Sequence, residues 1–236
     1  MRDDERSIIP SDVGQAIADR SPDVDLMIGT VGDEIRYWID EMGMDSDDEN
    51  VEVFYDFVLG KFASYKEKFP ELVQDLETAL AISDPVQDSK YSAMYPGIWE
   101  YADIASEVSF RVPSLDIVEK RLAAGGDGKT YMYQFDKRGT TNDFFGACHA
   151  CELCYVFNNT VFDYMTGRAE PKLAADVSAA WVAFARTGDP STEAHAWPQY
   201  DTEVRPVMVM NDDSTMGIVN DPKSAMRELL SEILIF

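Results

Sequence analysis

The sequence predicts an α/β protein, because short apolar runs typical of strands alternate with long helical stretches. The three predicted strands are residues 24–30, 130–135 and 206–210. The stretch between the first two strands is mainly helical, which indicates a helical insertion over the sheet. Neither an internal repeat, a low-complexity segment nor an obvious linker interrupts the 236 residues, so we expect one domain over residues 1–236.

The first predicted strand is an apolar run that ends at Gly29, which predicts burial on both of its faces. Helical signals begin directly after it, and in residues 51–69 apolar residues at spacings of three and four share one helical face. Pro113 is expected to separate the last two helices, with Ser114 as the N-cap of the second. The predicted helices of this stretch are residues 33–41, 51–69, 71–82, 99–110 and 114–124.

The second half of the chain continues the alternation of strands and helices. A turn at residues 125–128 leads into the tyrosine-rich second strand. Residues 172–186 form a predicted amphipathic helix that stops at Gly188, with Pro190 just beyond it. The third strand and a closing helix at residues 222–233 complete the pattern. The apolar face of the helix before Gly188 carries Leu173, Val177, Trp181 and Phe184.

The chain is strongly acidic, with 44 acidic and 20 basic residues and a formal net charge of −24. Such a surface repels phosphate backbones and anionic lipids, so neither nucleic acid nor a membrane is an expected partner. The longest apolar run, residues 179–185, is too short to cross a bilayer, and the first residues do not resemble a secretory signal. We expect a cytoplasmic protein, unless a signal lies on a preceding segment.

Only two histidines are present, His149 and His195. His149 follows a glycine turn and precedes a short predicted helix, so it lies at a loop end, where an α/β enzyme displays catalytic groups. A structural histidine is the alternative interpretation.

Three cysteines close to His149 suggest a metal or redox module as another alternative. Cys148, Cys151 and Cys154 form a C-x-x-C-x-x-C run, but no fourth cysteine completes an iron–sulfur set. Zinc could add a histidine, yet His149 is adjacent to Cys148 and both would struggle to reach one ion. We therefore interpret the thiols as small buried apolar side chains and expect neither a metal nor a cofactor.

Four blocks follow one another along the chain: residues 26–34, residues 146–157, residues 180–190 with 196–200, and residues 205–210. In this order they resemble the type-B carboxylesterase and cholinesterase family. The resemblance implies the C-terminal part of an α/β-hydrolase fold, with the last strands of the central sheet, flanking helices and a helical insertion. The third block, with its tryptophans, glycine and prolines at fixed offsets, is the most specific.

By this resemblance Glu34 is the acid and His149 the general base of a Ser-His-Glu triad. The order acid then histidine agrees with the order of triad members in α/β hydrolases. Ile35 replaces the glycine that usually follows the acid. Asp33 would point away from the histidine if the backbone is extended. Trp99 and Phe110 are candidates for the substrate pocket.

The serine of the triad has no candidate in this sequence. The nucleophile motif is G-x-S-x-G, and no two of the 14 glycines lie four residues apart around a serine. We therefore expect that the nucleophile half is absent, that the chain is inactive alone, and that its half-sheet exposes an unpaired edge. The expected partners are a small-molecule ester and a complementing N-terminal half; a non-catalytic interaction module is the alternative.

Overall fold

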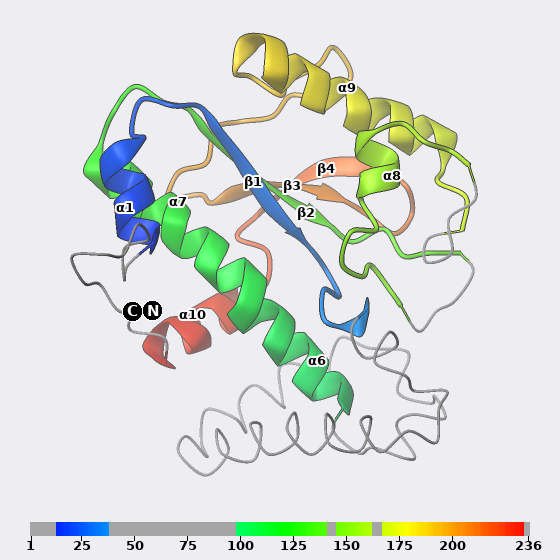
Figure 1. The fold of residues 1–236 in the computed structure, drawn as a ribbon, viewed down its shortest axis with the longest axis horizontal. Helices are drawn as coiled ribbons and strands as arrows, with labels where there is room; N and C mark the ends of the chain where they lie inside the picture. Colours follow the sequence, from blue (N-terminus) through cyan, green and yellow to red (C-terminus); the bar gives the residue numbers. More distant parts are fainter. Residues whose placement is uncertain (1–12, 38–97, 141–144, 162–166, 234–236) are drawn as a thin grey trace, which may run out of the picture.

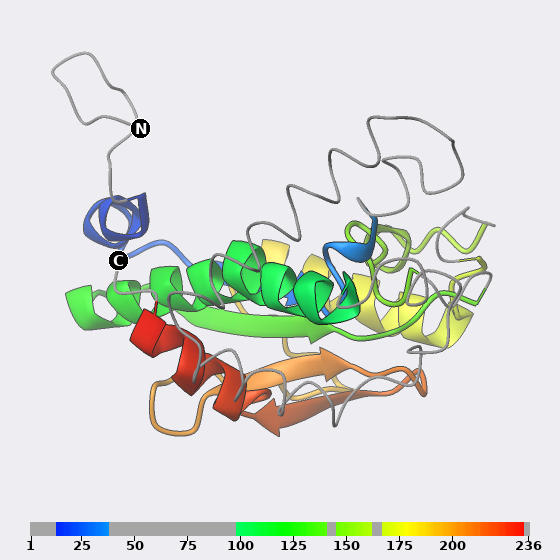
Figure 2. The same cartoon turned by 90° about the horizontal axis from the view of Figure 1, so that it is seen from below.

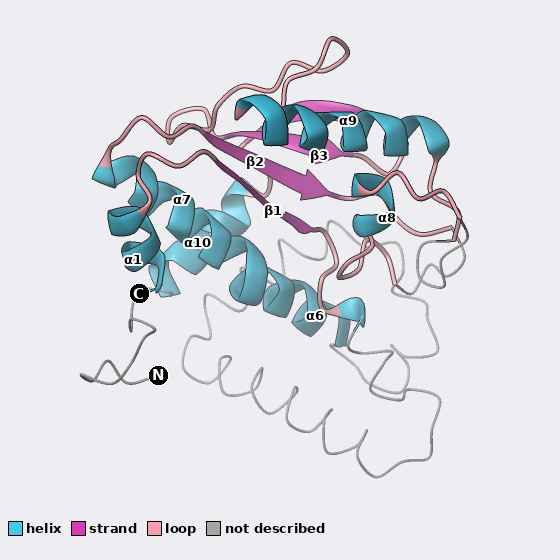
Figure 3. Cartoon of the chain, turned by 45° about the horizontal axis from the view of Figure 1, so that its top comes forward, coloured by secondary structure: helices cyan, strands magenta, loops and turns pink. Residues whose placement is uncertain are grey.

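A computed structural model of the chain describes residues 13–37, 98–140, 145–161 and 167–233. In this part of the chain, a four-stranded sheet with strand order β1-β2-β3-β4 lies between two layers of helices (Figure 3). The strands are β1 (Leu26–Val31), β2 (Thr130–Phe135), β3 (Pro206–Met210) and β4 (Met216–Asn220).

Parallel pairing joins β1 to β2 and β2 to β3, whereas β3 and β4 form an antiparallel hairpin. The register of β1 and β2 runs from Leu26 opposite Thr130 to Val31 opposite Phe135. Because the two strands are parallel and in step, their carboxyl ends lie at the same edge of the sheet. The three predicted strands are confirmed, and the α/β alternation of strands and helices with them.

The helices cover both faces of the sheet, and each face has its own apolar core (Figure 1). On one face α9 (Pro171–Thr187) and the short α8 (Leu153–Val156) pack through Leu173, Val177 and Tyr155. On the other face α7 (Val112–Ala124) packs through Leu115 and Val118, while α1 (Val13–Arg20) and α10 (Ser224–Ile233) contact α7. The predicted helices near α9 and α10 are confirmed.

The expected break at Pro113 is wrong. Helix α6 (Ile98–Ser106), the π-helical segment η1 (Glu107–Arg111) and α7 follow one another without a gap, as the continuous green helix in Figure 2 shows. Pro113 comes shortly after η1, where the backbone hydrogen bonding is of the π type, and this local change of pattern accommodates a residue without an N–H inside the helical run. Ser114 is not an N-cap, because its hydroxyl donates to the carbonyl of Phe110 (2.8 Å) inside the helical run.

The prediction that β1 is buried on both faces is also wrong. Its first four residues are only half-buried, whereas all five residues of β3 are buried. The reason is position, since β1 is the edge strand of the described sheet and has a strand neighbour on one side only. Val24, the predicted first residue of the strand, lies before it and is 60% exposed.

Two elements were not predicted, namely α1 and β4. The predicted helices at residues 51–69 and 71–82, and most of the one at residues 33–41, lie outside the described residues. Among the helices that are described, none combines the length and the apolar character that crossing a bilayer requires.

Candidate active site

The carboxyl ends of β1 and β2 carry the two segments of the candidate site. Directly after β1, residues 32–35 form a turn, which we call the acid turn. The loop after β2 returns to this turn at residues 145–152, which we call the histidine loop. The N–H of Gly32 donates to the carbonyl of Phe135 (2.8 Å), so the pairing of the two strands continues into the acid turn.

Glu34 of the acid turn and His149 of the histidine loop are in direct contact. The Oε2 atom of Glu34 lies 2.7 Å from Nδ1 of His149, although 115 residues separate the two in sequence. The Glu34 residue is buried, and its other oxygen, Oε1, accepts the N–H of Val31 (3.1 Å). The His149 side chain is 41% exposed. One edge of the imidazole is therefore held by a buried carboxylate while the ring remains accessible.

The backbone of the histidine loop supports this contact. The N–H of His149 points to the carbonyl of Glu34 (3.4 Å), and a tight turn follows, in which the N–H of Cys151 donates to the carbonyl of Cys148 (3.0 Å). Ala150 takes a left-handed conformation (φ 67°) in this turn, and α8 begins three residues later. The short helix expected after His149 is thus present.

Aromatic rings surround the imidazole on two sides. The centroid of Phe110, in η1, lies 5.6 Å from that of His149, and the centroid of Tyr37 lies 6.3 Å away. Phe110 therefore lies beside the imidazole of His149, and its role in a substrate pocket stays a prediction. The Trp99 side chain lies outside the described residues. Tyr37 was missed, because nothing in its sequence position distinguishes it from a packing residue.

A second carboxylate, that of Glu152, lies close to the pair. Its burial and the negative charge of Glu34 raise its pKa, although its own backbone N–H and His149 act in the opposite direction. The pKa of Tyr133 is raised too, first by burial and then by the charges of Glu152 and Glu34. Burial therefore acts on both the carboxylate of Glu152 and the phenol of Tyr133 next to the pair.

The three cysteines lie in or against the apolar core beside the histidine loop. Cys148 and Cys151 are buried, Cys154 is half-buried, and burial raises the pKa of the Cys151 thiol well above its usual range. Within the described ranges, no group of three His, Cys, Asp or Glu residues is arranged to hold a metal ion.

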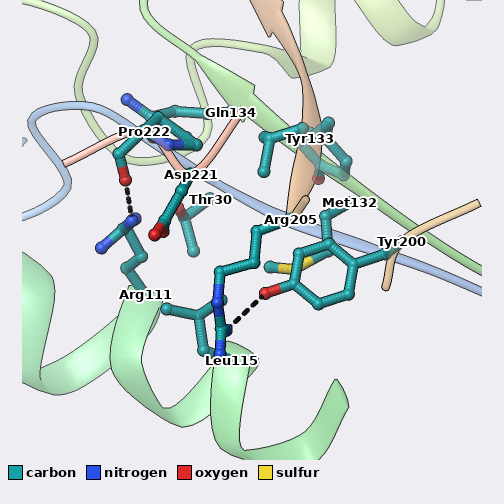
Figure 4. Close-up of a pocket in the computed structure, with 11 residues that line it drawn as sticks. Thr30, Arg111, Leu115, Met132, Tyr133, Gln134, Tyr200, Arg205, Asp221 and Pro222 are labelled. Carbon is teal, nitrogen blue, oxygen red and sulfur yellow. Dashed lines mark hydrogen bonds between the residues drawn. The ribbon is translucent and has the colours of Figure 1, made fainter. Parts of the chain in front are cut away.

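A small cavity lies on the α7 side of the sheet, between Leu115, Tyr200 and Arg205 (Figure 4). Its room of about 10 Å³ suits a single water molecule, far less than an ester needs. Two hydrogen bonds cross its rim, from Arg111 to the carbonyl of Pro222 and from Arg205 to the hydroxyl of Tyr200. Neither Glu34 nor His149 lines it, so this cavity is a packing gap and not the substrate site.

Comparison with known proteins places this geometry in context. The model of the carboxylesterase family matches residues 3–228. Para-nitrobenzyl esterase of Bacillus subtilis (strain 168) is 38% identical over 105 residues, which cover 42% of this chain and 21% of that protein. Bile salt-activated lipase of Bos taurus is 26% identical over 192 residues, 78% of this chain and 31% of that protein.

Solved structures of esterases confirm the predicted α/β-hydrolase fold class. A PNB esterase, 27% identical, matches 94% of this chain and 41% of its own with a TM-score of 0.62. A thermophilic PNB esterase, 25% identical, has the same coverage and a TM-score of 0.63. The chain therefore spans less than half the length of the relatives that it matches.

Proposed function

Since the chain belongs to the carboxylesterase family, we propose that it supplies the acid and the general base of a serine ester hydrolase. The observation that carries this proposal is the 2.7 Å contact between the buried carboxylate of Glu34 and Nδ1 of His149. A carboxylate at Nδ1 fixes the imidazole in the tautomer whose Nε2 accepts a proton. A binding protein without chemistry has no need of this arrangement.

In the proposed reaction, Nε2 of His149 removes the proton of a serine hydroxyl as that oxygen attacks the ester carbonyl. The same nitrogen then returns the proton to the leaving alcohol, and it repeats both steps when water releases the acyl group. In this mechanism the carboxylate of Glu34, in contact with Nδ1, stabilises the imidazolium that forms.

The serine is proposed to come from outside these 236 residues, because the sequence contains no G-x-S-x-G motif. The relatives that the chain matches are more than twice its length, which supports this proposal. A segment bearing the nucleophile would pair with the open edge of β1, beside which Glu34 lies. We propose small-molecule carboxylic esters as substrates.

The test is hydrolysis of a short-chain p-nitrophenyl ester. The chain is assayed alone and then co-expressed with the N-terminal part of Bacillus subtilis para-nitrobenzyl esterase. We expect activity only in the co-expressed pair, and its loss in His149→Ala and, by roughly 10³-fold or more, in Glu34→Gln.

Matched controls are His195→Ala and the exposed Glu193→Gln. His195 lies 3.4 Å from Asp176 on α9, away from Glu34, so both controls should retain full activity. Activity of the unaccompanied chain that depends on His149 would disprove a missing nucleophile. Association of the two halves without any activity would favour the alternative, an interaction module of the same fold.

A further inference from the structure

Asp33, next to the acid Glu34, makes its contacts with the backbone of the histidine loop and not with the imidazole. The N–H of Ala147 donates to Oδ2 of Asp33 (2.7 Å), and the N–H of Asp33 donates to the carbonyl of Ala147 (2.9 Å). Ala147 is thus held by both of its polar backbone groups, and it lies only two residues before His149.

Gly146 shows how closely the histidine loop passes over this carboxylate. A Cβ atom on Gly146 would stand 2.2 Å from Oδ2 of Asp33, and the residue is left-handed (φ 58°). Only glycine fits both conditions without displacing the carboxylate. The loop before His149 is therefore fitted to the Asp33 side chain.

The charge of Asp33 is compensated from its other side. Oδ1 of Asp33 lies 3.2 Å from Nη2 of the buried Arg36, which also lies 3.9 Å from Asp103 in α6. Burying a carboxylate is costly unless charge and hydrogen bonds compensate it, and here an arginine and the Ala147 amide do so. Nothing in the Glu34–His149 contact itself requires this second carboxylate.

From these contacts we propose that Asp33 is a positioning residue, which fastens the histidine loop to the acid turn and so sets the distance between His149 and Glu34. The two adjacent acids have different partners. Glu34 binds the imidazole of His149, and Asp33 binds the backbone of the loop that carries it. This role rests on the proposed function of the Glu34–His149 pair, but its contacts can be measured in the chain alone.

The experiment compares Asp33→Asn with Asp103→Asn by NMR. The control removes the other carboxylate beside Arg36 but leaves Ala147 untouched. Two signals are followed: hydrogen exchange of the Ala147 amide, and the far-downfield Nδ1–H proton of His149, which is simple to assign because the chain has only two histidines.

In Asp33→Asn the acceptor of the Ala147 N–H becomes a neutral amide oxygen. We therefore expect the Ala147 amide to exchange about 10- to 100-fold faster, as suits the weakening of a hydrogen bond to a charged acceptor. The downfield proton of His149 should broaden or vanish. Asp103→Asn should change neither signal. In the co-expressed esterase, kcat should fall about 10- to 100-fold with KM within about twofold, the pattern of a misplaced base.

Unchanged NMR signals in Asp33→Asn would overturn the positioning role, whatever the activity. Changed signals in a chain that never yields esterase activity would uphold it and refute the proposed function instead. If Asp33→Asn does not fold, the wild-type chain decides. Slow exchange of its Ala147 amide is required, and exchange at the rate of an unstructured peptide would disprove the proposal.

Discussion

The two sides of strand β1 differ in how far this chain completes them. On the side of β2, the N–H groups of Leu26 and Gly32 donate to Lys129 and Phe135 (both 2.8 Å). Backbone N–H groups along a strand point alternately to its two edges. Those of Met27, Gly29 and Val31 therefore point to the other edge, where the described residues supply no strand. There, the carboxylate of Glu34 accepts the N–H of Val31.

This difference shows that the contact between Glu34 and His149 can form although one edge of the described sheet has no neighbouring strand. The acid turn and the histidine loop are assembled by contacts within the chain, and Glu34 closes the last position of the open edge. The edge itself lacks a neighbour among the described strands. A chain of this kind can hold a preorganised acid and histidine and still need another segment for catalysis.

Two proline variants one residue apart should show the difference between the two edges of β1 most strongly. Ile28→Pro removes an N–H on the β2 side and should lower the free energy of unfolding by about 3 kcal/mol or more. Met27→Pro removes an N–H on the open side and should cost only about 1 kcal/mol of packing, because both side chains are similarly half-buried. Urea denaturation measures both.

The same pair of variants tests the open edge directly. Met27→Pro should fold yet fail to restore esterase activity with the N-terminal part of the relative, because proline blocks pairing at that edge. Equal destabilisation by the two prolines would mean that both sides of β1 are already paired.

A buried ion-pair cluster around Glu107 of η1 tests a part of the fold that the chain completes by itself. Its buried carboxylate accepts from Arg111 and Lys223 (2.9 Å each). Burial acts to raise the pKa of Glu107, but the two cations outweigh it and the pKa lies below its usual 4.5. The stabilisation is therefore complete above pH 4.5 and is lost as the pH falls through the lower folded-state pKa.

We expect Glu107→Gln to lower the free energy of unfolding at neutral pH by about 2 kcal/mol, less than for a fully buried pair because Lys223 is partly exposed. The variant should also lose less stability than wild type as the pH drops below 4.5. Asp116→Asn, which breaks a more exposed pair with Lys120, should cost only a few tenths, about 0.3 kcal/mol. Parallel pH profiles for Glu107→Gln and wild type would contradict this assignment.

The sequence predicted what depends on local pattern. The tyrosine-rich segment of β2, the apolar run of β3 and the amphipathic face of α9 are visible in single segments, and all three elements are present. Strand β4 was missed because Gly217 and its exposed residues weaken the apolar signal, although turn-forming residues between Met210 and Met216 indicated a hairpin. The helix break at Pro113 was wrong because the π-helical segment η1 just before it accommodates the proline within a continuous run.

The candidate site, like the fold, has residues that could be predicted and residues that could not. Glu34 and His149 were named from the resemblance, and the structure brings them together. The contacts of Asp33 could not be predicted, because they depend on a loop that lies more than a hundred residues away in sequence. Single-segment patterns contain no information on which of two adjacent carboxylates a distant loop will cover.

The smallest expected effect concerns Phe110, which η1 places beside His149. An aromatic contact of this kind contributes about 0.5–1.5 kcal/mol, so Phe110→Leu in the co-expressed esterase should raise KM for aromatic esters about 2- to 10-fold. If Phe110 contacts substrate, kcat should be nearly unchanged. The control, Phe157→Leu, alters a side chain that is 75% exposed and should change nothing. A fall in kcat at constant KM would instead show that Phe110 orients the imidazole, and would move it from the substrate pocket to the support of His149.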